Sequence, residues 1–284
     1  RFDGHRGTIY GVKLLKDQCR GLSCGLDGTV KLWHLADQRN IRTYNFEINQ
    51  LNRLQLSADE QVGMVYSVFT DKIVVFEVET GKVIEQATMP HDRLNAVHLF
   101  ADGKSVLLGG TQESGQDNVF IWKIGSGKGP EGVPGFNGRV YSFFPTQDGM
   151  DALVMGSEII DVAKKSSRPL IMSYASATSR LSVFDSPFKG FITRLHAAPG
   201  AALAVGSMGA LQIHSRPDLR LVKTIAQVKK DAPYPNGAQL VDHDRLILSV
   251  WSDSTLRVHE VSSGEELWSV RTEEPGTELA VTQD

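Results

Sequence analysis

Three short stretches of the sequence contain residue types that carry out chemistry in other proteins. Residues 21–25 (GLSCG) match the G-x-S-x-G pattern of a hydrolase nucleophile, residues 125–130 (GSGKGP) are similar to a phosphate-binding loop, and residues 242–244 (DHD) offer acid–base or metal-binding groups. The hydrolase pattern needs a helix after the serine, but a turn and another strand are expected there. A phosphate loop would need glycine where Trp122 stands, and three consecutive turn residues cannot all face one ion. We therefore expect no enzymatic activity, no metal site and no cofactor.

Composition and charge narrow the classes of partner. The 284 residues are 41% hydrophobic and 8% aromatic, which is enough for an extended core, and 27 glycines are typical of many short strands joined by turns. The net charge of −3 comes from 30 basic and 33 acidic residues without a basic block, so no nucleic-acid partner is expected. No apolar run reaches the roughly 18 residues that predict a membrane span, so no membrane partner is expected either.

The two cysteines bear on the compartment. Cys19 and Cys24 are expected in one strand, pointing to opposite faces, where they cannot pair with each other. Two buried free thiols favour the cytoplasm or another reducing intracellular compartment. Because the chain begins at Arg1 rather than methionine, we expect it to be part of a larger chain or complex.

A strand that ends in an aromatic residue or histidine recurs along the chain. Its six copies are residues 27–33 (DGTVKLW), 71–76 (DKIVVF), 117–122 (DNVFIW), 179–184 (SRLSVF), 209–214 (GALQIH) and 253–259 (DSTLRVH). Earlier partner strands end in hairpin signals such as Asp102-Gly103, and no helical periodicity is present. The uneven spacing of the fourth and fifth copies predicts an insertion at residues 158–178. These patterns predict an all-β chain of repeated antiparallel units.

Residues 4–35 resemble one repeat of the WD-repeat (WD40-type) family. A Gly-His pair opens this stretch, and Asp27-Gly28 and the strand ending at Trp33 close it. The resemblance implies a β-propeller of four-stranded antiparallel blades, each of roughly 40 to 45 residues. It also implies a structural tetrad of His5, Ser23, Asp27 and Trp33, in which the histidine bridges the carboxylate and the hydroxyl, and the hydroxyl meets the indole N–H.

Later units keep only parts of this tetrad. In the second, third and sixth units the residues kept are Ser67, Asp71 and Phe76; His91, Asp117 and Trp122; and Ser249 and Asp253. In the sixth unit His259 stands in the position of the tryptophan, and the fourth and fifth units match by strand pattern alone.

We expect one propeller domain over residues 1–284. The six blades are placed at about 4–46, 49–88, 91–136, 138–188, 190–226 and 236–271, with a partial blade formed by 276–284 and 1–2. This division predicts most of a seven-bladed ring, and a six-bladed ring is the alternative.

In WD-repeat proteins the usual partner-binding surface is formed by the Gly-His loops and the turns between the second and third strands of each blade. The resemblance places these residues there: Tyr10, Leu26, Asn52, Arg53, Arg93, Asn95, Gln116, Tyr141 and Thr193. Tyrosine and arginine are typical of protein interfaces, so we expect a non-catalytic interaction scaffold that binds a protein or peptide. Residues 158–178 and 228–237 offer further contact loops, the former with a Lys/Ser/Arg cluster suited to docking or phosphorylation.

A ligand-binding or enzymatic propeller with a site in its central channel is the alternative function. The expected first strands, residues 9–14, 51–56 and 140–144, contain no recurring acidic residue or histidine. A channel site would therefore lack ligands, which favours the scaffold.

Overall fold

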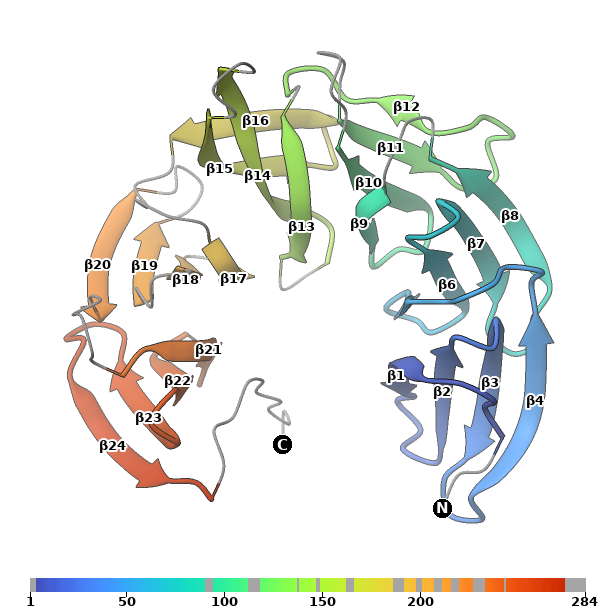
Figure 1. Ribbon diagram of the computed structural model, residues 1–284, viewed down its shortest axis with the longest axis horizontal. Coiled ribbons are helices and arrows are strands. Elements are labelled where there is room, and N and C mark those ends of the chain that lie inside the picture. Colours follow the sequence, from blue (N-terminus) through green and yellow to red (C-terminus); the bar gives the residue numbers. More distant parts are fainter. Residues whose placement is uncertain are drawn as a thin grey trace. The chain divides into compact units, whose positions relative to one another are not determined.

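The computed structural model consists of β-strands and turns, with no helix in the part of the chain that it describes. It describes residues 4–89, 94–111, 118–136, 138–146, 149–161, 166–185, 192–197, 201–206, 211–215, 220–226, 233–242 and 244–273. The strands form six four-stranded antiparallel sheets, and in each sheet neighbouring strands are consecutive in the chain (Figure 1). The predicted all-β chain of four-stranded repeats is thus confirmed.

The first three sheets contain the following strands: β1 (Ile9–Leu14), β2 (Arg20–Gly25), β3 (Thr29–His34) and β4 (Arg39–Asn45); β5 (Arg53–Leu56), β6 (Val62–Ser67), β7 (Lys72–Glu77) and β8 (Val83–Thr88); β9 (Leu94–Leu99), β10 (Ser105–Gly110), β11 (Val119–Lys123) and β12 (Glu131–Gly132). The last three contain β13 (Arg139–Pro145), β14 (Ala152–Asp161), β15 (Ser166–Ala175) and β16 (Arg180–Asp185); β17 (Ile192–Ala197), β18 (Ala201–Gly206), β19 (Leu211–Ser215) and β20 (Leu221–Ala226); β21 (Pro235–Val241), β22 (Leu246–Trp251), β23 (Thr255–Glu260) and β24 (Glu266–Arg271).

Alternation along the strands sets which side chains share a face. In the β2–β3 hairpin, Leu22 pairs with Leu32 and Cys24 with Val30, whereas Ser23 pairs with Lys31 on the opposite face. A register shift of one residue would exchange the two faces, so the turn that joins the strands has to be exact in length.

The fourth sheet corrects the predicted alignment of its repeat. Residues 179–184, aligned from the sequence with the third strands of other units, correspond to β16, the fourth strand. Residues 158–178, expected as an insertion, contribute the end of β14 and all of β15. β15 and β16 are both short strands rich in apolar residues, so the sequence pattern alone did not show which of them is the third strand of the sheet. Within that stretch, the Lys164-Lys165 pair lies outside the described residues.

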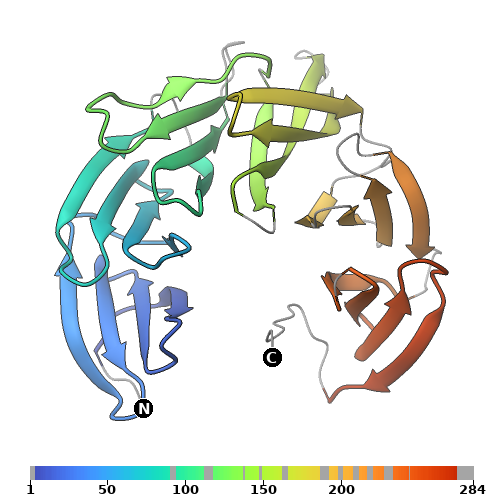
Figure 2. The same ribbon diagram turned by 180° about the vertical axis from the view of Figure 1, so that it is seen from behind.

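Contacts divide the chain into two compact units. The first comprises Arg1–Phe143, Asp148–Asp151 and Tyr174–Leu181; the second comprises Phe144–Gln147, Ala152–Ser173 and Ser182–Asp284. The first unit contains the three sheets of β1 to β12, which follow one another side by side in both views (Figure 1 and Figure 2).

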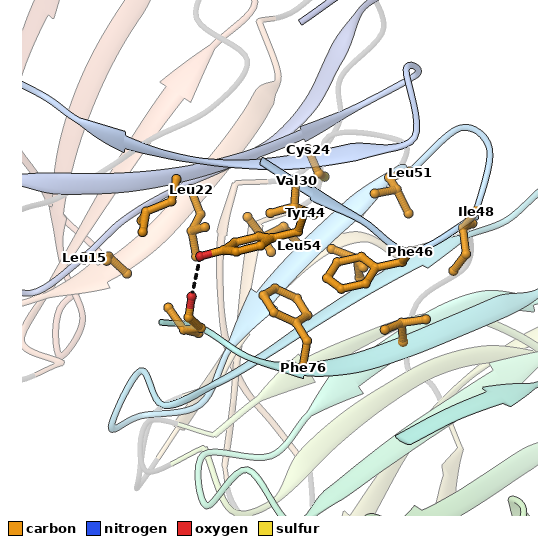
Figure 3. Close-up of a cluster of buried hydrophobic side chains, with 14 residues drawn as sticks. Leu15, Leu22, Cys24, Val30, Tyr44, Phe46, Ile48, Leu51, Leu54 and Phe76 are labelled. Carbon is orange, nitrogen blue, oxygen red and sulfur yellow. Dashed lines mark hydrogen bonds between the residues drawn. The ribbon is translucent and has the colours of Figure 1, made fainter. Parts of the chain in front are cut away.

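The first two sheets of that unit enclose a common core. Leu22 and Val30 from the β1–β4 sheet pack with Leu54 and Phe76 from the β5–β8 sheet, all nearly inaccessible to solvent (Figure 3). The Tyr44 hydroxyl in this core donates a hydrogen bond of 2.7 Å to the carbonyl oxygen of Val78, so its polar end is satisfied (Figure 3).

The β5–β8 and β9–β12 sheets share a second core, which contains Met64 and Val75 on one side and Leu108 and Trp122 on the other. Gln55 of β5 joins these sheets through its amide group. Its Nε2 donates to the Val97 carbonyl oxygen and its Oε1 accepts from the Leu99 N–H, both at 2.7 Å.

The second unit has its own core. Leu211 and Ile213 of β19 pack with Leu240 of β21 and Ile247 of β22. One sheet thus covers a face of the next here too, which is how a four-stranded sheet buries an apolar face.

The cysteine prediction is half wrong. Cys24 is buried on β2, but Cys19 lies in the turn before that strand and is exposed. The strand starts one residue later because Asp17 organises this turn, accepting hydrogen bonds of 2.9 Å from the N–H groups of Cys19 and Arg20.

Candidate functional site

The four tetrad residues of the first sheet form one hydrogen-bonded chain. His5 Nδ1 lies 2.9 Å from Asp27 Oδ2 and His5 Nε2 lies 2.7 Å from Ser23 Oγ, while Trp33 Nε1 donates to Ser23 Oγ at 2.8 Å. We assign a neutral imidazole with its proton on Nδ1, because every donor then has one acceptor. The chain runs from the indole through the hydroxyl and the imidazole to the carboxylate. The His5 side chain is 3% exposed, so these bonds form away from water.

The Asp27 carboxylate fixes two segments at once. It accepts hydrogen bonds from the Arg6 N–H at 2.9 Å and from the Thr29 hydroxyl at 2.8 Å, in addition to its contact with His5. Burial on its own would raise the pKa of this carboxyl, but the hydrogen bonds from Arg6, Thr29 and His5 outweigh it and lower the pKa to about 2. Asp27 is therefore ionised at neutral pH and holds the segment before β1 against the β2–β3 turn.

The second sheet does not bring its partial tetrad together. Phe76 pairs with Gly63 just as Trp33 pairs with Gly21, so Val65 rather than Ser67 stands in the position of Ser23. The Ser67 hydroxyl instead accepts from the Phe69 N–H at 3.3 Å. Asp71 Oδ1 accepts from the Leu94 N–H at 2.9 Å and so anchors the start of β9.

The third sheet has a tryptophan without the hydroxyl. Trp122 pairs with Val106, which places Leu108 where the first sheet has Ser23. The buried Trp122 Nε1 has no hydrogen-bond partner in the described part of the chain. His91 and Asp117, which the sequence assigned to this group, lie outside the described residues.

The sixth sheet builds a different polar group from partly unpredicted residues. Ser249 accepts a hydrogen bond of 2.9 Å from Trp251 Nε1, an indole on the same strand, while His259 occupies the register position of Trp33. Arg257 Nη2 lies 2.6 Å from Asp253 Oδ2, and its guanidinium carbon is 4.1 Å from the centroid of the Trp251 ring. Arg257 is thus the side-chain partner of Asp253 in the sixth sheet, as His5 is the partner of Asp27 in the first sheet.

Trp251 and Arg257 were missed by sequence reasoning. A tryptophan two residues after Ser249 and an arginine four residues after Asp253 were the available signals. They were overlooked because a third-strand tryptophan was expected.

The residues expected at the partner-binding surface differ in accessibility. Tyr10 is 45% exposed, Tyr141 is 36% exposed and Arg53 is exposed, whereas Leu26 is half-buried. Asn52 is buried, and its Oδ1 accepts from the Val68 N–H at 3.1 Å.

Among the other residues expected at this surface, Asn95 is held by hydrogen bonds inside the protein, and the side chains of three more lie outside the described part of the chain. Asn95 is half-buried, and its Nδ2 donates to Thr111 Oγ1 at 2.6 Å and to the Val140 carbonyl oxygen at 3.1 Å. Arg93, Gln116 and the side chain of Thr193 on β17 lie outside the described part of the chain.

The β6–β7 turn adds two apolar residues that sequence reasoning did not select. Val68 is 38% exposed and Phe69 is 64% exposed. Two consecutive apolar residues in a turn, where polar residues are usual, were the available signal.

Backbone hydrogen bonds join these turns into one surface of the first unit. The Leu26 N–H donates to the Thr8 carbonyl oxygen at 2.9 Å, and the Leu51 N–H donates to that of Gly25 at 3.1 Å. Together with the bond from Val68 to Asn52, they link the starts of β1 and β5 to the β2–β3 and β6–β7 turns. We call Tyr10, Leu26, Arg53, Val68 and Phe69 the turn surface.

Arg53 is the charged member of the turn surface. Burial raises the pKa of the Cys24 thiol and of the Tyr66 phenol to about 12 each, and the Arg53 charge opposes both shifts. These two neighbours therefore stay uncharged at neutral pH. The exposed Arg53 side chain donates from Nη1 to the Asn52 carbonyl oxygen at 3.2 Å, and a guanidinium has further N–H groups with which it can bind a partner.

The other sequence motifs take structural places. Ser23 lies within β2, which a turn connects to β3, and residues 125–130 form an exposed loop between β11 and β12. Asp242 and Asp244 lie in the β21–β22 turn, and His243 is outside the described residues. Of the 228–237 segment, Tyr234 is 50% exposed and Pro235 begins β21.

The described residues contain neither a metal-binding cluster nor a membrane-spanning helix. No group of three or more His, Cys, Asp or Glu side chains lies close enough to hold a metal ion there. Within the same residues, no helix has the length and apolar character needed to cross a membrane.

No protein-family model matches the chain, and no curated protein matches it significantly.

Proposed function

We propose that this chain is a WD-repeat-type β-propeller whose sheets are its blades and make up most of a seven-bladed ring. The hydrogen-bonded group of His5, Ser23, Asp27 and Trp33 supports this proposal, because all four residue types occur at the family's spacing and in the family's order of contacts. The repeated stacking of four-stranded sheets supports it as well.

The function that we propose is binding of a protein or peptide partner on the turn surface, without catalysis. One observation carries it: Tyr10 at the start of β1, Arg53 at the start of β5 and Phe69 in the β6–β7 turn are all exposed, and hydrogen bonds join the segments that carry them. Aromatic rings and arginine contribute most of the binding energy at protein interfaces, and a rigid support lowers the entropy lost on binding. The chemistry of the turn surface fits a segment with an acidic side chain beside an apolar one.

Selection from a random peptide library displayed on phage tests this proposal. Peptides selected on the wild-type chain would be synthesised, and their affinities measured by fluorescence anisotropy for wild type and for the Tyr10→Ala/Phe69→Ala double variant. We expect the double variant to lose at least about tenfold in affinity, because two aromatic anchors are removed. Arg53→Gln should weaken binding chiefly at low salt, since it removes a charge interaction that salt screens.

The matched control is Val222→Ala, which truncates an apolar side chain of similar exposure, 63%, in the second unit. Its affinities should equal those of wild type, and all variants should retain the wild-type melting temperature. Selected peptides that bind the double variant as tightly as wild type would contradict the assignment to the turn surface. Tyr141→Ala then tests whether the remaining exposed tyrosine of the expected surface contributes.

A further inference from the structure

In three pairs of consecutive sheets, one sheet covers a face of the next in the same way. We call the face that packs on the preceding sheet the near face, and the face that packs on the following sheet the far face. In the β5–β8 sheet, Leu54, Val65 and Phe76 lie on the near face, in the core shared with β1–β4. Trp33 pairs with Gly21 in the first sheet as Phe76 pairs with Gly63 in the second. Aligning the sheets on these pairs shows which residues of each sheet lie on its near face.

The near face of the β1–β4 sheet exposes two apolar residues that other sheets bury. By register, Val12 and Leu14 of β1 correspond to Leu54 and Leu56 of β5. Leu54 is 4% exposed, and Leu56 packs against the core of the first two sheets. Val12 is 63% exposed and Leu14 is 68% exposed. The first sheet therefore presents a near face with nothing packed on β1.

The β9–β12 and β21–β24 sheets follow the same rule as β5–β8. The residues that correspond to Leu14 are Leu99 in β9 and Leu240 in β21, with exposures of 3% and 4%. Each packs in a core with residues of the preceding sheet. Leu14 is therefore exposed because no sheet covers it, since the same strand position is buried in the other two sheets.

The far face of the β21–β24 sheet is the complementary case. Trp268 and Val270 on β24 are 51% and 42% exposed, and register places them beside Val258 and Leu256, which are only half-buried. In the β1–β4 sheet the residues at the register positions of Leu256 and Val258 are Val30 and Leu32. These are 0% and 2% exposed because the next sheet covers them.

We infer that the far face of the β21–β24 sheet binds the near face of the β1–β4 sheet of a second copy of this chain. Each face carries exposed apolar side chains, Val12 and Leu14 on the near face and Trp268 and Val270 on the far face. The chain's own sheets show what covers such faces: a far face is buried by a near face of the same construction. Covering them removes apolar area from water, which is favourable. The contact joins different faces of the two copies, so it is head-to-tail and leads to rings or linear assemblies rather than to an isolated symmetric dimer.

Sedimentation velocity across a concentration series tests this interface. Wild type should pass from monomer to larger species as concentration rises. The near-face variant Val12→Glu/Leu14→Glu and the far-face variant Trp268→Glu/Val270→Glu should each remain monomeric, because each lacks one of the two faces. The control is Leu221→Glu/Val222→Glu, which places the same charges at residues that are 45% and 63% exposed on β20, and it should associate as wild type does.

Mixing the two face variants distinguishes a head-to-tail contact from other modes of association. Each variant keeps the face that the other has lost, so the mixture should form a one-to-one dimer and nothing larger. Wild type that stays monomeric at every concentration, or association that both face variants retain, would overturn the inference. So would a large drop in the melting temperature of the near-face variant, since that would mean that Val12 and Leu14 are covered within one chain. None of these residues belongs to the turn surface, so peptide binding there is tested separately.

Discussion

At the scale of single residues, two buried tryptophans differ in whether their indole N–H is satisfied. Trp33 Nε1 donates to Ser23, whereas Trp122 Nε1 has no partner in the described part of the chain. Trp33→Phe removes a hydrogen bond and should cost about 1 kcal/mol more unfolding free energy than Trp122→Phe, which removes an unsatisfied donor. Urea unfolding of both variants measures the difference, and equal losses would show that the bond to Ser23 contributes nothing net.

The residue scale also shows how far a spacing pattern reaches. The spacing of His5, Ser23, Asp27 and Trp33 was sufficient to select four side chains that meet in space. In the sixth sheet the same logic selected Ser249 and Asp253 but not their partners. The indole that contacts Ser249 is that of Trp251, on the same strand, and the cation that contacts Asp253 is Arg257, on the neighbouring strand. A spacing pattern taken from the first sheet does not select residues at these positions.

At the scale of elements, the β2–β3 turn has a strict local requirement at one glycine. Gly28 has a φ of 75°, and a Cβ placed there would lie 2.6 Å from the Ile48 carbonyl oxygen. Gly125 has a φ of 80° with no atom within 4 Å of the same Cβ position. Both alanine variants bear the left-handed strain of about 1 kcal/mol, but Gly28→Ala adds a clash with backbone and should destabilise the protein more.

Thermal unfolding of the two glycine variants tests this requirement. Gly125→Ala is the control for strain alone, and Gly28→Ala should melt at a clearly lower temperature. Equal melting temperatures would mean that the segment around Ile48 moves aside at no cost. The β2–β3 turn would then be held less tightly against the residues around Ile48 than the hydrogen bond from the Leu51 N–H to the Gly25 carbonyl oxygen indicates.

Element type and number were predictable to different degrees. Short alternating strands and Asp-Gly turns predicted the all-β sheets, and the Asp102-Gly103 turn does join β9 and β10 with a φ of 67° at the glycine. The place of β16 within its sheet was not predictable, because β15 and β16 both have the composition of a strand and the sequence does not show which of them is third. What distinguishes them is the neighbour that covers each face, and this depends on residues distant in the sequence.

At the scale of the whole molecule, stability should be passed from sheet to sheet through the shared cores. Phe76 is fully buried, with its ring centroid 4.9 Å from that of Phe46 and 5.8 Å from that of Tyr44. Phe76→Ala should cost about 3 to 5 kcal/mol, because it leaves a large cavity between the first two sheets. In a stack where each sheet contacts only its neighbours, that loss is felt most strongly next to the cavity.

Amide hydrogen exchange followed by mass spectrometry measures how far the Phe76→Ala loss extends. Exchange should accelerate in β1 to β8, while β21 to β24, whose core contains Leu240 and Ile247, should exchange at wild-type rates. A uniform acceleration along the chain would instead mean that it opens only as one cooperative whole. That outcome would require a closed path of contacts through all six sheets, since an open stack leaves its distant sheets unaffected. The same experiment therefore distinguishes the partial ring proposed above, whose first and last sheets are not coupled, from a closed ring, whose first and last sheets are.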